Sequence, residues 1–344
     1  MTLLSAKLIA NLLLGASVTV LAFGQAKADS AGEALPDRTP DQWLSHMNSA
    51  FAELNYDGVF TYYNGVDLST LRIVHLVLDG IEHERLVHLN GAPREIVRAA
   101  DEVVSFLQPG DELVELQGSI PAGPFARAFS ASFERVSQHY ELTATQLDRV
   151  AGRSAHALTI APKDNYRHGY RIWLDADTGL LLRSELVNEQ GQRLEIFQFT
   201  YLKISDDIST SALEPDVDER SMVTTSFSLG TPQDLSQPIG DSAWVAGWVP
   251  AGFQLATWEV RPMPGKARSV NTLMYSDGLA AFSVFVEKMP QAGAGEMMSR
   301  DGATVAVTSH VDGPEDRAYL VTVVGEIPEE TARRVARSIH FQGS

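Results

Sequence analysis

Apolar residues recur at helical spacing near the start of the chain, between residues 41 and 54. Trp43, Met47, Ala50, Phe51 and Leu54 follow one another at intervals of one to four positions. Because an α-helix turns once every 3.6 residues, this spacing places the five side chains on one stripe. The pattern predicts an amphipathic helix that buries one apolar face against the rest of the protein.

From residue 55 to residue 117 the pattern changes to short runs rich in Val, Ile, Phe and Tyr. The runs are separated by pairs such as Asn64-Gly65, Asp79-Gly80 and Asn90-Gly91, which are typical of tight β-hairpins. Strands this close together predict an antiparallel meander rather than β-α-β units. The predicted strands span residues 56–63, 71–78, 82–89, 94–99, 102–107 and 112–117.

A second apolar stripe lies between residues 125 and 140, after a Gly- and Pro-containing breaker. Its members, three or four positions apart, are Phe125, Phe129, Phe133, Val136 and Tyr140. This spacing predicts a second amphipathic helix. Strands are expected again over residues 155–160, 166–175, 179–187 and 193–204. The first half therefore reads as a long antiparallel sheet with two helices that cover one of its faces.

Residues 206–240 separate two regular regions. They are rich in Ser, Thr, Asp and Pro and lack a sustained period, which is typical of a linker. Beyond them the pattern predicts strands near residues 252–261, 270–276, 280–287, 303–309 and 317–324, and a helix over 328–339. We therefore expect an α+β protein with a larger domain over residues 29–205 and a smaller one over 241–344.

The first 28 residues have the pattern of a secretory signal peptide. Lys7 precedes an apolar run over residues 8–23, and Ala26 and Ala28 supply the small residues that a signal peptidase requires. Cleavage is expected before Asp29. The alternative is a retained membrane anchor, but 16 apolar residues are fewer than the roughly 20 that span a bilayer as a helix. The sequence thus favours an exported protein, and the family resemblance given below implies the periplasm.

Composition excludes several classes of function. The net charge of −17 argues against binding to nucleic acid or to an anionic membrane surface. The chain has no cysteine, so it can form no disulfide, thiolate metal site or cysteine nucleophile. A secreted chain without disulfides must be stabilised by buried apolar surface, and its length is sufficient for that.

The candidate catalytic and metal-binding patterns are weak. His83 and His88 are five positions apart in a predicted strand, whereas zinc proteases place two histidines four apart on a helix. Asp175 and Asp177 precede Gly179 without the glutamate that ends a calcium loop, so a hairpin turn is favoured. No serine-nucleophile elbow and no phosphate-binding or dinucleotide-binding glycine motif is present. We expect neither an enzyme nor a cofactor, and we assign no catalytic or metal-binding residue.

The aromatic and methionine side chains of the first half allow two interpretations. They either fill a closed core or line an apolar cavity that takes a lipid chain, because both arrangements need the same inward-facing residues. The residues concerned are Trp43, Met47, Phe51, Phe60, Tyr62, Phe125, Phe129 and Phe133.

The chain also resembles a known family, the RseB/MucB proteins, which are periplasmic negative regulators of sigma-E (AlgU-type) envelope-stress factors. The resemblance is spread over nearly all of the chain after the signal peptide, and the segments are specific only in combination. In the first half they span residues 89–98, 164–175, 178–184 and 194–199, and in the second half residues 248–253, 275–279, 282–286 and 324–328.

The resemblance implies a fold and a function. The larger domain would be a LolA-like, half-open antiparallel sheet with capping helices. The smaller domain would hold the periplasmic segment of a membrane-bound anti-sigma factor of the RseA/MucA type and so protect it from regulated intramembrane proteolysis. Lipopolysaccharide or a related lipid would release that partner, and no cofactor is implied. Self-association into a homo-oligomer is left open.

Two segments of the smaller domain are candidates for contact with this partner. The first is the turn formed by Tyr275, Ser276, Asp277, Gly278 and Leu279, which could equally be a structural hairpin turn. The second is the basic face of the predicted last helix, with Arg333, Arg334 and Arg337, although solvated arginines are the commoner interpretation. A periplasmic lipid or lipoprotein carrier is the alternative function.

Overall fold

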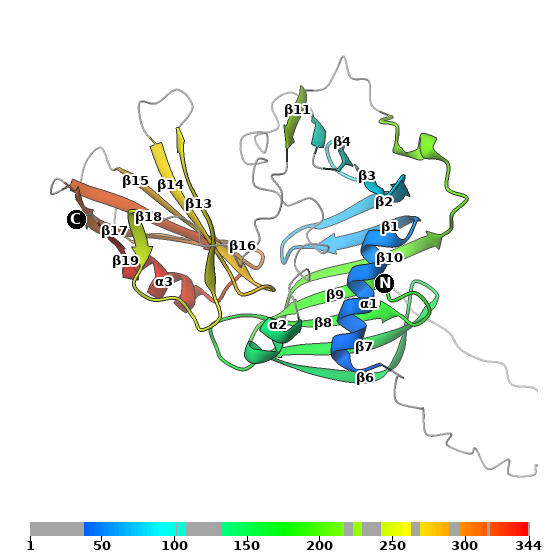
Figure 1. Cartoon of the computed structure of the whole chain (residues 1–344), viewed down its shortest axis with the longest axis horizontal. Helices are drawn as coiled ribbons and strands as arrows, with labels where there is room; N and C mark the ends of the chain where they lie inside the picture. The colour runs from blue at the N-terminus through cyan, green and yellow to red at the C-terminus, as the bar shows by residue number, and fades with distance from the viewer. Residues whose placement is uncertain are drawn as a thin grey trace, which may run out of the picture. The chain divides into compact units, whose positions relative to one another are not determined.

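The computed structural model describes residues 38–342 except 101, 108–132, 217–222, 229–241, 263–268, 289–295 and 315–316. The described residues belong to one compact unit and are built mainly from antiparallel strands with three α-helices (Figure 1). None of these helices is long and apolar enough to cross a membrane. The predicted signal peptide with Ala26 and Ala28 lies outside the described residues.

Helix α1 (Pro40–Glu53) confirms the first predicted helix. Proline at the first helical position has the required φ and no N–H to leave unpaired. The backbone N–H of Thr39 donates to Oε1 of Gln42 at 2.9 Å and so closes the N-terminus. The helix ends at Leu54, whose backbone is extended. Its buried side chains, Trp43, Leu44, Met47 and Ala50, belong to one core cluster with residues of the large sheet, and the helix lies across that sheet (Figure 1).

The large sheet has eleven strands in the order β11-β5-β4-β3-β2-β1-β10-β9-β8-β7-β6, and every pair is antiparallel. It curves around α1 (Figure 1). Its strands are β1 (Tyr56–Tyr63), β2 (Leu68–Leu78), β3 (Ile81–His88), β4 (Arg94–Ala99), β5 (Glu102–Leu107), β6 (Tyr140–Val150), β7 (Arg153–Pro162), β8 (Gly169–Asp175), β9 (Leu181–Val187), β10 (Arg193–Ile204) and β11 (Val223–Ser228).

The second predicted helix is confirmed over residues 133–139 and is wrong at its last residue. Helix α2 (Phe133–His139) has seven residues, and Tyr140 begins strand β6. Tyr140 is 1% exposed and pairs with Pro162 of β7, so the residue that completed the helical stripe is buried as part of a strand. Phe125 and Phe129, and the predicted strand over residues 112–117, lie outside the described residues.

The segment expected to be a linker contains two short elements. Residues Thr210–Leu213 form the 3₁₀-helix η3, and strand β11 pairs with β5 from Val223↔Leu107 to Ser228↔Glu102. Strand β11 reads Val-Thr-Thr-Ser-Phe-Ser and has little apolar character. It joins the sheet through backbone hydrogen bonds, which do not depend on side-chain polarity. Hydrophobic periodicity therefore carries no signal for this strand.

The smaller sheet has six strands in the order β13-β14-β15-β18-β17-β16. Helix α3 (Glu329–Ser338) packs on β17 and β18 through Ala332, Val335 and Ala336. Strands β12 (Trp244–Ala246) and β19 (Ile339–Phe341) form a separate two-stranded ribbon. The strands of the sheet are β13 (Gln254–Pro262), β14 (Ser269–Ser276), β15 (Ala281–Lys288), β16 (Met298–Asp301), β17 (Thr304–Gly313) and β18 (Arg317–Gly325).

Each sheet has its own hydrophobic core. The large sheet and α1 enclose a cluster that includes Met47, Leu158, Ile160 and Ile172, and the smaller sheet and α3 enclose a valine-rich cluster around Val323. Residue alternation along β15 and β18 places the buried side chains on one face. The expected α+β class, with a curved antiparallel sheet and a smaller second sheet, is confirmed.

Candidate functional site

The turn over residues 275–279, expected as a candidate partner contact, joins β14 to β15 and carries a fully buried carboxylate. Oδ1 of Asp277 accepts hydrogen bonds from the backbone N–H groups of Leu279 at 2.9 Å and Ala280 at 2.8 Å. Its other oxygen, Oδ2, accepts from the hydroxyl of Tyr140 at 3.0 Å and from the guanidinium of Arg167 at 2.5 Å. Asp277 therefore links the smaller sheet to residues of the large-sheet half.

Arg167 is the cationic partner in this contact, and its side chain is 0% exposed. Its guanidinium also donates to both carboxylate oxygens of Asp164 and to the backbone carbonyl of Ala251. It lies 5.5 Å from the ring centroid of Tyr140 and 5.1 Å from that of Phe253. A buried charge is tolerated only when it is paired and hydrogen-bonded, and the contacts of Arg167 meet both conditions.

The ion pair of Asp277 and Arg167 leaves little of the turn exposed for contact with another protein in this conformation. Asp277 is 0% exposed, and Tyr275 and Leu279 are also buried. Ser276 and Gly278 are half-buried, and the hydroxyl of Ser276 accepts from the N–H of Gly278 at 3.0 Å. The structural role is thus visible in the contacts, and contact of the five residues with a partner stays a prediction.

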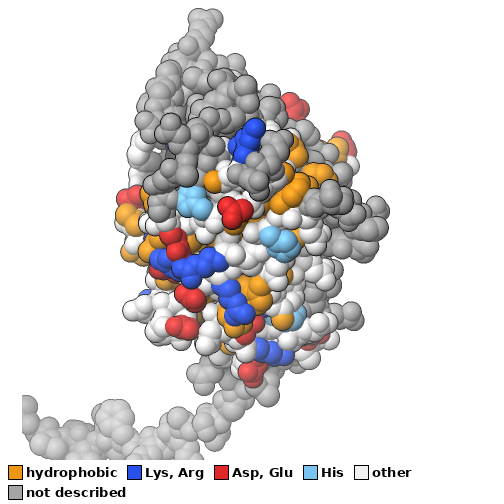
Figure 2. All heavy atoms as spheres, turned by 90° about the vertical axis from the view of Figure 1, so that its left-hand side faces the viewer, with side chains coloured by type: hydrophobic (Ala, Val, Ile, Leu, Met, Phe, Trp, Pro, Cys, Tyr) orange, Lys and Arg blue, Asp and Glu red, His pale blue; other side chains and the backbone are white. Residues whose placement is uncertain are grey.

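The basic residues of α3 are largely engaged within the chain. Arg333 and Arg337 both donate to Glu296, and Arg333 also pairs with Glu329. The hydrogen bond from Arg337 is the main cause that lowers the pKa of Glu296. Arg334 stacks on Trp248, with Cζ 3.9 Å from the ring centroid. On the face drawn in Figure 2, basic side chains lie beside acidic ones and form no continuous basic patch.

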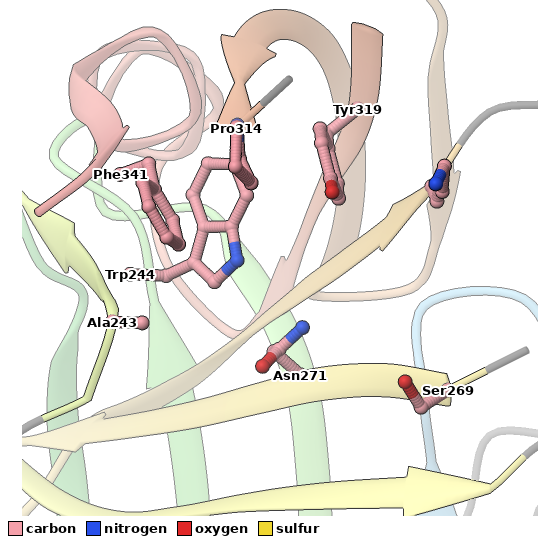
Figure 3. A pocket seen from close by; sticks show the side chains of 8 residues that line it. Ala243, Trp244, Ser269, Asn271, Pro314, Tyr319 and Phe341 are labelled. Carbon is pink, nitrogen blue, oxygen red and sulfur yellow. The ribbon is translucent and has the colours of Figure 1, made fainter. Parts of the chain in front are cut away.

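A groove lies in the smaller half, beside strands β12 and β14. Its volume is about 340 Å³, and it opens to solvent. Trp244 projects from β12 between Phe341 and Tyr319 (Figure 3). The centroid of the Trp244 ring lies 4.8 Å from that of Tyr319 and 5.3 Å from that of Phe341. The lining consists of Ala243, Trp244, Ser269, Asn271, Lys288, Pro314, Tyr319 and Phe341.

The groove combines apolar walls with polar groups on one side. Pro314, Tyr319 and Phe341 supply apolar surface, and Asn271 and Ser269 lie on β14 across the opening (Figure 3). Lys288, at the end of β15, adds a positive charge. The exposed lining is about as polar as it is apolar, and a concave surface of this mixed kind can hold a side chain of a bound peptide.

The proposed lipid-lining residues take different positions in the large-sheet half. Trp43 and Met47 on α1 are 2% and 0% exposed, and Phe60 on β1 is 8% exposed. Phe51 and Tyr62 are partly buried and pack against the same cluster. Phe133 begins α2, while its side chain, like Phe125 and Phe129, lies outside the described part. The described members make the contacts of a packed core, and a lipid cavity stays a prediction.

The described residues contain no group of three or more His, Cys, Asp or Glu side chains arranged to hold a metal ion. His83 and His88 lie on β3, five positions apart. Asp175 ends β8, and its Oδ1 accepts from the N–H groups of Asp177 at 3.3 Å and Thr178 at 3.0 Å. These are the contacts of the Asp-containing hairpin turn that the sequence favours over a calcium loop.

Sequence reasoning missed Arg167, Trp244 and Lys288 as site residues. Arg167 lies inside a segment that carries the family resemblance, but its partner Asp277 is 110 positions away. Trp244 belongs to a three-residue strand within a stretch that has no periodic pattern. Lys288 is the last residue of an otherwise alternating strand. Local pattern therefore gave no signal for any of the three.

Comparison with known proteins identifies the family of the chain. Its family models, the MucB/RseB N-terminal and C-terminal domains, match residues 39–217 and 238–340. The sigma factor AlgU regulatory protein MucB of Pseudomonas aeruginosa is 37% identical over 301 residues, which cover 86% of this chain and 89% of that protein. The sigma-E factor regulatory protein RseB of Escherichia coli K12 is 30% identical over 302 residues, 87% of this chain and 89% of that protein.

Solved structures agree with the sequence comparison. The crystal structure of MucB in complex with MucA(peri) aligns with a TM-score of 0.73 at 34% identity, and covers 89% of this chain and 100% of that chain. The structure of the Pseudomonas aeruginosa MucA/MucB complex aligns with a TM-score of 0.72 and covers 99% of that chain. The matches extend over both sheets, and this chain belongs to the MucB/RseB family.

Proposed function

We propose that this chain binds the periplasmic segment of a membrane-bound anti-sigma factor and thereby shields it from regulated proteolysis. The chain would act as a negative regulator of a sigma-E-type factor in the periplasm, to which the predicted signal peptide would export it. The observation that carries the proposal is the similarity over both domains to a MucB that was crystallised with MucA(peri).

The groove of the smaller half offers a contact for such a segment. A disordered peptide that folds on binding needs anchor pockets that bury an apolar side chain. Trp244 is itself buried, so in this proposal the groove beside Tyr319 and Phe341 would take the anchor side chain, and Lys288 would attract an acidic neighbour of the anchor residue. Proteases require an extended and accessible chain, so a segment held in this way is poorly cut.

Release by lipid is the second part of the proposal. A lipid can displace the partner only if it binds the partner-free state more tightly than the complex. To change the chain from almost fully partner-bound to almost fully partner-free, the binding free energies of the lipid for these two states must differ by about 5.5 kcal/mol. Burial of an acyl chain yields about 0.8 kcal/mol per methylene, so about seven buried methylenes suffice. The interior between α1 and the large sheet is the proposed place of binding.

The direct test uses the mature chain and the periplasmic segment of an anti-sigma factor from the same organism. In a pull-down we expect the segment to be retained, and in a digestion with the site-1 protease we expect slower cleavage. Addition of lipopolysaccharide should restore cleavage. Unchanged cleavage at saturating concentrations of the chain would overturn the proposed function.

A charge reversal tests the groove. The Lys288→Glu variant should bind the segment at least about tenfold more weakly, because it replaces the positive charge that is proposed to attract an acidic residue of the segment by a negative one. The matched control is Lys203→Glu, which makes the same change at an exposed position of β10 and should bind as the wild type does. Equal binding by both variants would remove the groove from the proposal and leave the shielding function in place.

A further inference from the structure

The turn between β16 and β17 makes a close backbone contact with the large sheet. A Cβ atom added at Gly302 would lie 1.5 Å from the backbone oxygen of Asn64. A Cβ at Gly65 would lie 2.9 Å from Cα of Gly302 and 3.0 Å from the oxygen of Leu194. Only glycines allow this approach, which brings the β1–β2 turn and the start of β10 against the smaller sheet.

A pair of acidic side chains lies at this contact. Glu195 of β10 accepts hydrogen bonds from the backbone N–H of Ala303 and from the hydroxyl of Tyr62. Glu326, which directly follows β18, is close enough to repel Glu195 electrostatically. Both side chains are half-buried, and two carboxylates that are partly removed from water and lie close enough to repel each other cannot both ionise without a cost in free energy.

We propose that this contact is a pH-dependent latch between the two sheets, closed while at least one of Glu195 and Glu326 is protonated and loosened when both carboxyls are ionised. The latch adds a control on the conformation of the chain that does not depend on whether the chain binds an anti-sigma factor.

The direction of the dependence follows from the environment of the pair. Burial, followed by repulsion from Glu326, raises the pKa of Glu195 to about 8. Burial also raises the pKa of Glu326. Closing therefore takes up a proton between the ordinary pKa of a glutamate and about 8. The closed state is favoured as pH falls through this range, by up to about tenfold per pH unit for each proton taken up.

The tyrosine and histidine side chains near Glu195 and Glu326 do not change their charge in the pH range in which this pair titrates. Burial raises the pKa of Tyr62 on β1 and of Tyr170 on β8 far above this range, so both stay neutral. Asp301 on β16 adds a further negative charge. Burial and the charge of Arg300 lower the pKa of His168 to about 4, so this histidine also stays neutral above that pH.

A second contact keeps the chain from separating when the latch loosens. The ion pair of Arg167 and Asp277 lies in other segments of the chain than the contact at Gly302. Burial lowers the pKa of Arg167, but its hydrogen bonds to Asp164 raise it, so the guanidinium stays charged. Thr331 of α3 also donates to the backbone oxygen of Tyr166 at 3.1 Å. We therefore expect the two sheets to pivot about this second contact when the turn at Gly302 opens, so that the distance between them varies without their dissociation.

Distance measurements in the mature chain test the latch. Because the chain contains no cysteine, cysteines placed at the exposed positions Asp207 and Gln342 are the only sites for spin labels. Double electron–electron resonance at about pH 6 should give one narrow distance distribution, and at about pH 9 a broader one. Identical distributions at both pH values would overturn the proposal.

Two further variants separate the latch from a general loss of stability. Glu195→Gln and Glu326→Gln are isosteric, cannot ionise and should keep the narrow distribution at about pH 9. The control Glu141→Gln removes an exposed carboxylate of β6 and should broaden as the wild type does. A broadening at high pH that persists in both latch variants would also overturn the proposal. The anti-sigma segment is absent from the measurement, so its outcome is independent of the shielding function.

Discussion

At the scale of single residues, the buried pair of Arg167 and Asp277 should contribute strongly to folding. Replacing Asp277 by Ala leaves a guanidinium that is 0% exposed with only part of its compensating charge. Removing one partner of a buried ion pair typically costs about 3–5 kcal/mol. We expect Asp277→Ala to lower the free energy of unfolding by a value in this range, measured by urea denaturation of the mature chain.

The matched control is the ion pair of Arg72 and Asp57, whose side chains are 40% and 22% exposed. Partly exposed pairs of this kind contribute about 0–1 kcal/mol because water already solvates both charges. Asp57→Ala should therefore change the free energy of unfolding by no more than about 1 kcal/mol. If both variants lose the same amount, burial does not set the strength of the Arg167–Asp277 contact.

At the scale of elements, substitutions of two glycines in hairpin turns allow the cost of backbone strain to be distinguished from the cost of a steric clash. Gly91 has φ +77° with nothing within 4 Å of an added Cβ, whereas Gly302 has φ +58° and directly faces Asn64. Both Gly→Ala changes cost about 1–2 kcal/mol for the left-handed backbone. Gly302→Ala should cost about 1–3 kcal/mol more from overpacking. Thermal unfolding of the two variants measures the difference, and equal losses would show that the turns do not touch in solution.

Elements with local signals could be predicted from the sequence. The strands that match β1, β4, β5 and β10 are bounded by turn residues or alternate clearly, and α1 has both a proline at its start and an apolar stripe. Strands β11 and β6 could not be predicted in this way. Each is held in the sheet by pairing with a neighbouring strand, β5 or β7, and its own sequence does not show that pairing. Tyr140 fits a helical stripe equally well, and only its pairing with Pro162 decides for a strand.

The candidate site was less predictable than the fold for the same physical reason. The Asp277 turn is visible in the sequence as Ser-Asp-Gly, but its partners Tyr140 and Arg167 are more than a hundred positions away. Glu195 and Glu326 come together only through the turn at Gly302. A contact between distant segments depends on how whole sheets pack. The periodicity of hydrophobic residues predicts only the local helix or strand and does not predict such contacts.

At the scale of the whole molecule, two sets of buried groups act on the free energy of unfolding in opposite directions. Glu195, whose folded pKa is raised to about 8, binds a proton more readily in the folded chain, so its contribution is lost as pH rises from the ordinary value of 4.5 through 8. His168, whose folded pKa is lowered to about 4, contributes stability that is lost as pH falls from 6.5 through 4. Burial lowers the pKa of His46 and His156 as well, in the same direction.

The free energy of unfolding should therefore reach its maximum near the ordinary histidine value of 6.5, because above it the pair of Glu195 and Glu326 titrates without opposition from the histidines and below it the histidines oppose the pair. The expected slope above the maximum is a loss of up to about 1.4 kcal/mol per pH unit for each proton released. Urea denaturation across the pH range measures the curve. Glu195→Gln should flatten its alkaline side, and His168→Asn should move the maximum to lower pH. An alkaline slope that survives in Glu195→Gln would show that another group carries the dependence, since the glutamine cannot release a proton.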